Sequence, residues 1–574
     1  MVDEIALEEM AVHFSKYNKI AGLCWKHSHL IDPVLRTKFT DGEVHFGKEL
    51  TVIGVACFGE DELYPVLAAP TCKTENAGDM EITLTLAIER WNVTGAAASV
   101  GPVWSFATNG DATRRAAGHK LFLKKPLLPE SPLYGILNNM PGLNTMTGDA
   151  EVMLDFDFKH IFKRFCTLIR SAARIVLNNS RVINSMMLSR YLVWLPAYNE
   201  ASVMKLLHPD DPQDVPRAIE LMQAIVEFSK SQYSILNDSF STDVNTRANL
   251  VSITLLSNLI ESILVPFINT KLSLTEQVQS LSCYAHLAFS IFRVHRRLFM
   301  PFQLYYDTQT CVKNVIFNIT KQQLLDPYKS FFLGDCGDNR LELMFGRSRM
   351  IGGHNSGCSY SQALDRLGTA KDIDGVFNRH PELDPGHRRL SLGKRIEDVD
   401  HINRMMWRGD IISGHCDLPS AWRQGREIAL SILTTSQIGP INYSFADLFR
   451  DPGTNILCPL GKNKYFGIAE EELDDSSRVP NLPPVVPATL PSHVIETVIS
   501  EAGDIQGVHM ATDEDDEELM LTFEEELIAQ SISDIPPTQP HPLPTVPSAL
   551  QGAGIRANDY LLYKGRWIHK QTIC

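Results

Sequence analysis

Three acidic residues, far apart in the sequence, lie where they could hold divalent metal ions. Asp3 is in the opening segment, Asp111 directly follows an apolar run at residues 103–108, and Glu342 is in a short segment with helical spacing. Cleavage of a phosphodiester by two metal ions needs carboxylates from different elements around ions roughly 4 Å apart. The sequence therefore predicts Asp3, Asp111 and Glu342 as catalytic residues and as ligands of Mg²⁺ or Mn²⁺.

Each of these acids also has a simpler interpretation. Asp3 could be an N-terminal acid without a role, and Asp111 could cap the helix that follows it. Glu342 could be a solvated helix acid that pairs with Arg340 or Arg349. The catalytic hypothesis requires residues 3, 111 and 342 to converge, whereas an unrelated helical scaffold would place them far apart in space.

A fourth pattern places Asp157, His160 and Lys163 on successive turns of one predicted helix. Apolar residues recur there at steps of three and four, which predicts an amphipathic helix with strongly basic polar faces. The cations that could follow a DNA backbone are Lys159, Lys163, Arg170 and Arg174. A solvated basic face is the alternative, and a half-buried helix histidine is the alternative to a role of His160 near substrate or metal.

The elements that would position these residues are of two kinds. Apolar runs rich in Val, Ile and Leu predict strands at residues 20–25, 50–58 and 103–108, whereas residues 80–91 fit a helix or a strand. Residues 156–330 are helical in pattern, with helices expected at 217–236, 246–268 and 274–299, and a short helix is expected around 340–349. The longest apolar run, 250–268, is interrupted by polar residues that include Ser252, Ser257, Asn258, Glu261 and Ser262, and it predicts a buried helix rather than a membrane span.

The charge of the chain is unevenly distributed. The net charge is −15, but residues 479–555 contain 13 acids and no Lys or Arg, so the rest of the chain carries −2. A near-neutral body permits nucleic-acid binding without indicating it. Residues 479–555 also hold eleven prolines, which predicts a disordered acidic linker. The eleven cysteines are scattered and form no Cys-x-x-Cys pair, so no zinc finger or ribbon is predicted, and this usage suits a reducing compartment.

Taken together, the acidic motifs resemble those of P element-like transposases, including the THAP-domain-linked ones, and of similar fungal transposon-derived proteins. The resemblance covers roughly residues 1–360 and includes a long helical insertion before the last Glu. The matching segments are Asp3-Glu4, Asn109-Gly110-Asp111 displaced by about one residue, Asp157 with His160 and Lys163, and Leu341-Glu342 followed by Phe345-Gly346, Arg349 and Gly352-Gly353.

The resemblance implies an α/β fold with an RNase H-like mixed sheet and flanking helices, interrupted by an all-helical insertion. The expected parts are the first part of the core at 1–175, the insertion at 176–330, the last part of the core with a basic extension at 331–460, a disordered acidic and Pro-rich linker at 461–555, and a short hydrophobic segment at 556–574.

The same resemblance implies a DDE-type DNA transposase that cuts and transfers transposon DNA with Mg²⁺ or Mn²⁺. Its implied partners are transposon-end and target DNA and further copies of the chain, with no membrane and a nuclear location, and Arg349 joins the expected DNA contacts. GTP is implied by the family alone, and no Gly-x-x-x-x-Gly-Lys-Ser/Thr loop is present. The alternatives are a catalytically dead, transposase-derived protein that binds DNA or protein, and an unrelated helical scaffold with an acidic tail.

Overall fold

The computed structural model describes residues 1–14, 19–27, 44–171, 175–178, 181–211, 214–235, 243–352, 357–380, 383, 404–436, 438, 443–468, 560–563 and 566–569. The chain forms two units, Met1–Val485 and Val486–Cys574. The second unit is described through one antiparallel hairpin, β12 (Tyr560–Tyr563) with β13 (Arg566–His569). The acidic linker predicted at 461–555 lies outside the described residues from 469 onward.

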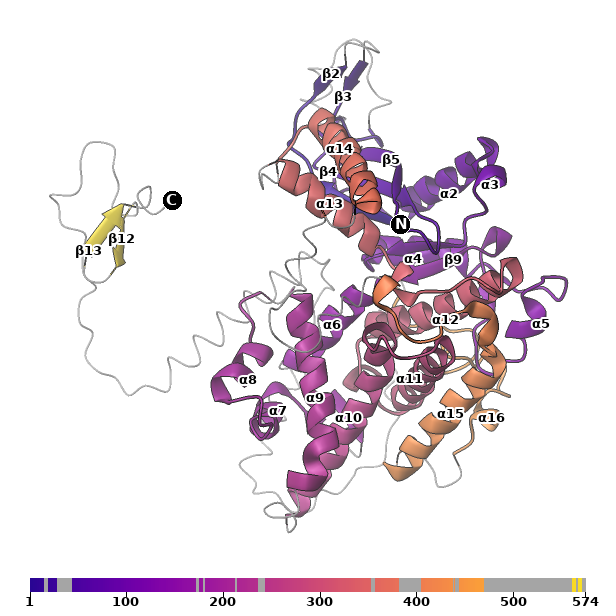
Figure 1. The fold of residues 1–574 in the computed structure, drawn as a ribbon, viewed down its shortest axis with the longest axis vertical. Coiled ribbons are helices and arrows are strands. Elements are labelled where there is room, and N and C mark those ends of the chain that lie inside the picture. Colours follow the sequence, from indigo (N-terminus) through magenta and orange to yellow (C-terminus); the bar gives the residue numbers. More distant parts are fainter. Residues whose placement is uncertain are drawn as a thin grey trace. The chain divides into compact units, whose positions relative to one another are not determined.

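Two small sheets lie at the N-terminal part of the first unit (Figure 1). β1 (Val2–Ala6), β4 (Glu49–Val55) and β5 (Tyr64–Thr71) form an antiparallel sheet in the order β1-β4-β5. β6 (Ser105–Thr108) and β9 (Met153–Phe156) pair in parallel, and β6 contacts β1. The strands predicted at 50–58 and 103–108 are thus confirmed, and the predicted strand at 20–25 is reduced to β3.

The other strand pairs are short antiparallel hairpins or bridges. They are β2 (Val12–Phe14) with β3 (Lys19–Ala21), β7 (Lys125–Pro126) with β8 (Met146–Thr147), and β10 (Ile175–Asn178) with β11 (Arg181–Ile183).

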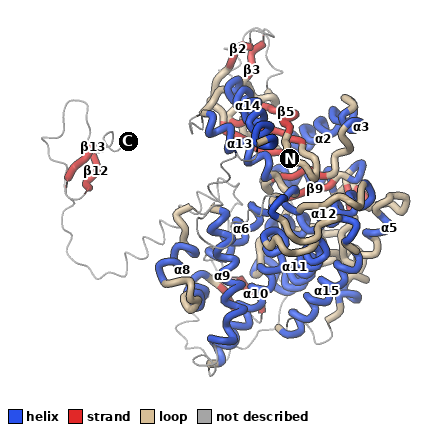
Figure 2. Tube along the Cα trace, viewed as in Figure 1, coloured by secondary structure: helices blue, strands red, loops and turns tan. Residues whose placement is uncertain are grey.

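Helices make up most of the unit (Figure 2). Those before residue 215 are α2 (Ala77–Val93), α3 (Ala96–Ser99), α4 (Ala112–Phe122), α5 (Tyr134–Leu137), α6 (Phe158–Arg170), α7 (Ser185–Leu192) and α8 (Glu200–Leu207). The later ones are α9 (Val215–Ile235), α10 (Val244–Ile268), α11 (Leu274–His295), α12 (Phe302–Leu325), α13 (Asn339–Ile351), α14 (Tyr360–Arg379), α15 (Leu418–Thr435) and α16 (Phe445–Leu448). The predicted helices at 217–236, 246–268, 274–299 and 340–349 are confirmed, and residues 80–91 are helical.

The main hydrophobic core runs from the sheets into the long helices without a break. It includes Val2 of β1, Phe106 of β6, Leu256 of α10 and Ile316 of α12. α12 is central, since almost every residue from its start to Gln322 is buried. The boundaries expected at residues 175 and 330 therefore fall inside one packed unit. That unit also includes buried Tyr465 and Phe466, so packed structure continues past the expected linker start at 461.

Among the described residues, α10 is a helix long and apolar enough to cross a membrane by length and composition. In the structure it packs between α9 and α11, and 67% of its most apolar window is buried inside the unit. This burial agrees with the predicted core helix.

A second, smaller core fixes the position of α13. Ile5 and Leu50 of the antiparallel sheet pack with Leu341 and Phe345 of α13 and with Leu367 of α14. Because Leu341 is anchored to this sheet, the neighbouring Glu342 is held beside β1 although 339 residues of sequence separate it from Asp3.

Candidate metal and nucleic-acid site

Four carboxylates converge where β1, the end of β9 and the start of α13 meet. Asp3 lies on β1, Asp157 directly follows β9 and caps α6, and Asp338 and Glu342 lie at the start of α13. Asp338 has electrostatic interactions with each of the other three. The structure thus brings together two of the predicted catalytic residues, Asp3 and Glu342, with Asp157.

The approach of α13 to β9 depends on Gly337. Its N–H donates to Asp155 Oδ2 at 2.8 Å, and its φ of +82° is a conformation that favours glycine. A Cβ there would lie 2.4 Å from Asp157 Oδ1. Glycine is therefore needed for Asp338 to follow so closely on Asp157.

Asp157 and Asp338 are fully buried and retain free acceptor atoms. Asp157 Oδ2 accepts from the N–H groups of Lys159 (2.9 Å) and His160 (3.0 Å), but Asp157 Oδ1 and both Asp338 oxygens have no hydrogen-bond partner in the described structure. Asp338 stands at the N-cap of α13 without making a capping bond. Candidate ligand atoms of Asp157, His160 and Asp338 lie within 4.8 Å of one another. Buried, unpaired carboxylate oxygens are costly unless a cation or proton compensates them.

Repulsion within the group is visible in the acidities. Burial raises the pKa of Asp3, of Asp157 and of Asp338, and Glu342 raises each of them further. The charges of Asp157 and Asp3 also raise the pKa of Asp338. A divalent cation among these side chains would relieve this repulsion.

Glu342 differs because cations already surround it. His160 Nε2 lies 2.9 Å from Glu342 Oε1, and Lys159 Nζ lies 3.8 Å from Oε2. Burial raises the pKa of Glu342, but the His160 hydrogen bond and the charges of His160, Lys159 and Lys163 outweigh it and bring the pKa down to about 2. Glu342 is thus ionised at neutral pH, and it orients the imidazole of His160.

Asp111 has a different local role. Its carboxylate accepts from the N–H groups of Thr113 (2.9 Å) and Arg114 (3.1 Å) and so caps α4. The residue of this loop that reaches Asp3 is Asn109, whose Nδ2 lies 3.3 Å from Asp3 Oδ1. A catalytic role of Asp111 stays a prediction.

Substituting Asp111 separates its capping role from a role in metal binding. Asp111→Ala is expected to lower the free energy of unfolding by about 1 kcal/mol, whereas Asp111→Asn is expected to be nearly neutral, because asparagine caps as well as aspartate. Urea denaturation of both variants measures this difference. A weaker Mn²⁺ affinity in Asp111→Asn, measured by calorimetry, would instead place Asp111 among the ligands.

The predicted DNA-contacting cations are spread over different environments. Lys159 contacts Asn339 and Glu342 inside the acidic group, and Lys163 is half-buried close to it. Arg170 points inward, where its Nε donates to the Leu206 carbonyl at 3.0 Å and burial lowers its pKa. Arg349 is exposed on α13. Arg174 lies outside the described residues.

Sequence reasoning missed Asp338, which is not among the predicted catalytic residues. An available signal was the Gly337-Asp338 pair directly before a helix, with Glu342 one turn further on. The acid is recognisable as functional only when its unpartnered oxygens are seen beside Asp157.

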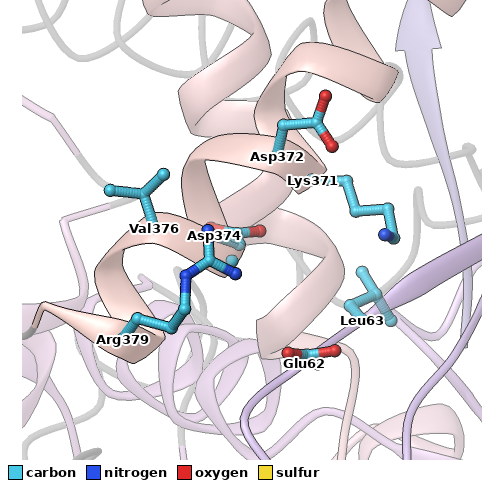
Figure 3. Close-up of a pocket in the computed structure, with 8 residues that line it drawn as sticks. Glu62, Leu63, Lys371, Asp372, Asp374, Val376 and Arg379 are labelled. Atoms are coloured by element: carbon cyan, nitrogen blue, oxygen red, sulfur yellow. The ribbon is translucent and has the colours of Figure 1, made fainter.

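A surface pocket of about 300 Å³ lies elsewhere, along α14 (Figure 3). Its lining carries both signs of charge, with Glu62, Asp372 and Asp374 facing Lys371 and Arg379. None of its lining residues belongs to the acidic group.

Among known proteins, one solved structure is similar to this chain. No family model matches the chain, and no curated protein matches it. A Drosophila P element transposase strand transfer complex is similar in structure, with 11% sequence identity, a TM-score of 0.43, and coverage of 66% of this chain and 76% of that one. A TM-score below 0.5 does not establish a shared fold.

Proposed function

We propose that this chain is a metal-dependent DNA-cutting protein of the DDE transposase type, with Mg²⁺ or Mn²⁺ held by Asp157 and Asp338 and flanked by Asp3 and Glu342. The observation that carries the proposal is the convergence of four carboxylates, two of them fully buried with unpartnered oxygens. Hard divalent cations are the groups that such an oxygen-rich site suits.

The order of the strands supports an RNase H-like core. The antiparallel sheet β5-β4-β1 meets the parallel pair β6-β9 where β1 contacts β6. Asp3 lies on the central strand of this series, and Asp157 follows its last strand. This placement brings acids from several elements to one site, as a two-metal centre requires.

The residues around the acids can position a phosphate. Lys163, near Glu342, and the exposed Arg349 on α13 would contact the DNA backbone, whose charge such cations neutralise. His160, held by Glu342 at 2.9 Å, can accept or donate a proton next to the reacting group. When bound, the metal ions would activate water or a 3′-hydroxyl and stabilise the leaving oxygen.

A specific observation favours a second candidate, a non-catalytic DNA-binding descendant. Asn109, an amide, occupies the position beside Asp3 at the end of β6 where a further carboxylate would complete the acidic group. Arg114 also lies 3.5 Å from Asp3 and pairs with Glu4, so part of the negative charge is neutralised by the protein itself.

Strand cleavage of supercoiled and end-labelled linear DNA in Mg²⁺ and in Mn²⁺ tests the first candidate. Asp338→Asn and Glu342→Gln are each expected to lower the rate by at least about 100-fold, since even outer partners of metal ligands cost about 10- to 100-fold when mutated. Asp149→Asn, at an exposed ion pair outside the acidic group, serves as the matched control. Equal rates in all four proteins would refute the assignment, and metal binding without cleavage would favour the second candidate.

A further inference from the structure

A second group of side chains that could hold a metal ion lies where the segments after β3 and β5 meet the segment before β4. Cys24 follows β3, His45 precedes β4, and Cys72 directly follows β5. His27 is one turn beyond Cys24 in a Cys-x-x-His pair. Segments nearly fifty residues apart thus deliver two thiols and two imidazoles to one place.

The distances within this group fit a tetrahedral zinc ion. Cys72 Sγ lies 3.4 Å from His45 Nδ1 and 3.7 Å from His27 Nδ1. With Zn–S of about 2.3 Å and Zn–N of about 2.05 Å, a tetrahedron places S and N about 3.6 Å apart. Ligand atoms of Cys24, His27 and Cys72 all lie within 4.8 Å of one another. The imidazoles of His27 and His45 face each other with ring centroids 4.3 Å apart.

The backbone holds the ligands in place independently of their side chains. The N–H of Cys24 donates to the His45 carbonyl at 2.9 Å, and the N–H of His27 donates to the Cys24 carbonyl at 3.1 Å. Trp25 N–H donates to the Pro70 carbonyl at 2.9 Å, which ties the Cys24 segment to β5 just before Cys72. A preformed cradle of this kind lowers the entropic cost of binding an ion.

The surroundings of the two cysteines keep solvent away from the group. Cys24 and Cys72 are buried, so the ligand atoms are shielded from solvent. In the ion-free chain the Glu75 carboxylate accepts from the Cys24 thiol and from the Cys72 N–H, each at 3.1 Å. Lys26 stands beside them, paired with Asp79 at 2.6 Å. Burial and the Glu75 hydrogen bond raise the pKa of Cys24, so a zinc ion would displace the thiol proton when it binds.

We propose that Cys24, His27, His45 and Cys72 form a structural zinc site. Soft thiolates with imidazoles select zinc over the hard cations expected at the acidic group. Four protein ligands leave no open position, so the site has a structural and not a catalytic role. It would fasten the β2–β3 hairpin and the segment before β4 to the end of β5, on the sheet whose β1 carries Asp3.

The test is the zinc content of the full-length chain, purified without chelator, by elemental mass spectrometry. The expected result is about one zinc per chain in the wild type and in Asp338→Asn, and a loss in Cys72→Ser. Cys57→Ser, a half-buried cysteine outside the group, is the matched control and should retain zinc. Zinc that is lost in Asp338→Asn but kept in Cys72→Ser would place the ion at the acidic group and refute the site.

Cobalt substitution provides a readout that does not depend on a variant that folds. Co²⁺ added to the zinc-stripped wild type is expected to give visible bands of a tetrahedral complex and a thiolate charge-transfer band, and one equivalent of Zn²⁺ should remove both. A wild-type chain that lacks zinc and gives no cobalt bands would overturn the proposal. So would the recovery of Cys24 and Cys72 as a disulfide from the natively purified protein.

Discussion

Asp338→Asn is expected to stabilise the metal-free chain and to abolish its stabilisation by Mn²⁺ or Mg²⁺. Both Asp338 oxygens are buried without a partner, and Asp157, Asp3 and Glu342 repel its charge. An amide of the same shape removes that repulsion, and an unsatisfied buried group costs about 1–3 kcal/mol or more when charged. In EDTA the free energy of unfolding of Asp338→Asn should therefore exceed that of the wild type by an amount of this order.

Metal should stabilise the wild type but not Asp338→Asn. A ligand at 100 times its dissociation constant stabilises the native state by about 2.7 kcal/mol. Urea denaturation with and without saturating Mn²⁺ should show this gain in the wild type and in the exposed-site control Asp149→Asn, but not in Asp338→Asn. If Asp338→Asn is less stable than the wild type in EDTA and keeps the Mn²⁺ response, the acidic group is a structural network instead.

The same substitution should change how stability depends on pH. The folded-state pKa of Asp338 is raised well above 3.8, so its contribution to stability is complete below 3.8 and is lost as the pH rises through the folded value. Asp155, with a pKa raised by burial to about 7, has the same sign in both proteins. The pKa of Glu342 is lowered to about 2, so its contribution to stability is lost only as the pH falls below 4.5. Between pH 5 and 7 in EDTA, wild-type stability should therefore fall more steeply than that of Asp338→Asn.

The elements around the site were largely predictable from sequence, because their signals are local. The apolar run before Thr108 and the three- and four-residue steps of α6 follow directly from strand and helix geometry. Glu342 could be singled out by the Leu-Glu-x-x-Phe-Gly segment in which it lies, on a short predicted helix. These signals need no knowledge of what packs against each element.

The membership of the site could not be predicted, because it depends on contacts between distant segments. The sequence does not distinguish an aspartate that caps a helix from one that leaves its oxygens free. Asp111 and Asp157 cap their helices, whereas Asp338 does not. Cys24 and Cys72 are isolated cysteines in the sequence, and they meet only because the segment after β3 binds the end of β5 through the Trp25 N–H and the Pro70 carbonyl. The helical segment expected as an insertion supplies α12, whose central position follows only from three-dimensional packing.

Asp307 connects α12 to the loop beside the acidic group through two arginines. Its carboxylate, 1% exposed, accepts two hydrogen bonds from Arg115 of α4, at 2.8 and 2.9 Å, and one from Arg164 of α6, at 2.8 Å. Both arginines also donate to the carbonyl of Gly110. Gly110 has φ +88°, and a Cβ there would meet Arg164 at 2.8 Å, so the loop between Asn109 and Asp111 is fitted closely to this ion network.

Asp307→Ala is expected to destabilise the chain by about 3–5 kcal/mol, since removing one partner leaves the buried charge of Arg115 uncompensated. The measurement is equilibrium urea denaturation in EDTA, which keeps metal binding out of the comparison. Arg115→Met with Asp307→Leu removes both charges and should recover most of the loss, because well-packed apolar residues can replace a buried pair at little cost. Asp149→Ala, at an exposed ion pair, should change stability by less than about 1 kcal/mol.

The double variant also separates support of the Gly110 loop from simple charge burial. If the network only neutralises Arg115, restoring stability with Met and Leu should restore Mn²⁺ affinity as well. If it positions the loop, the double variant should be stable yet bind Mn²⁺ more weakly, because Asn109 of that loop contacts Asp3 at 3.3 Å. A stability loss in Asp307→Ala as small as that in Asp149→Ala would show that α12 does not hold the loop through Asp307.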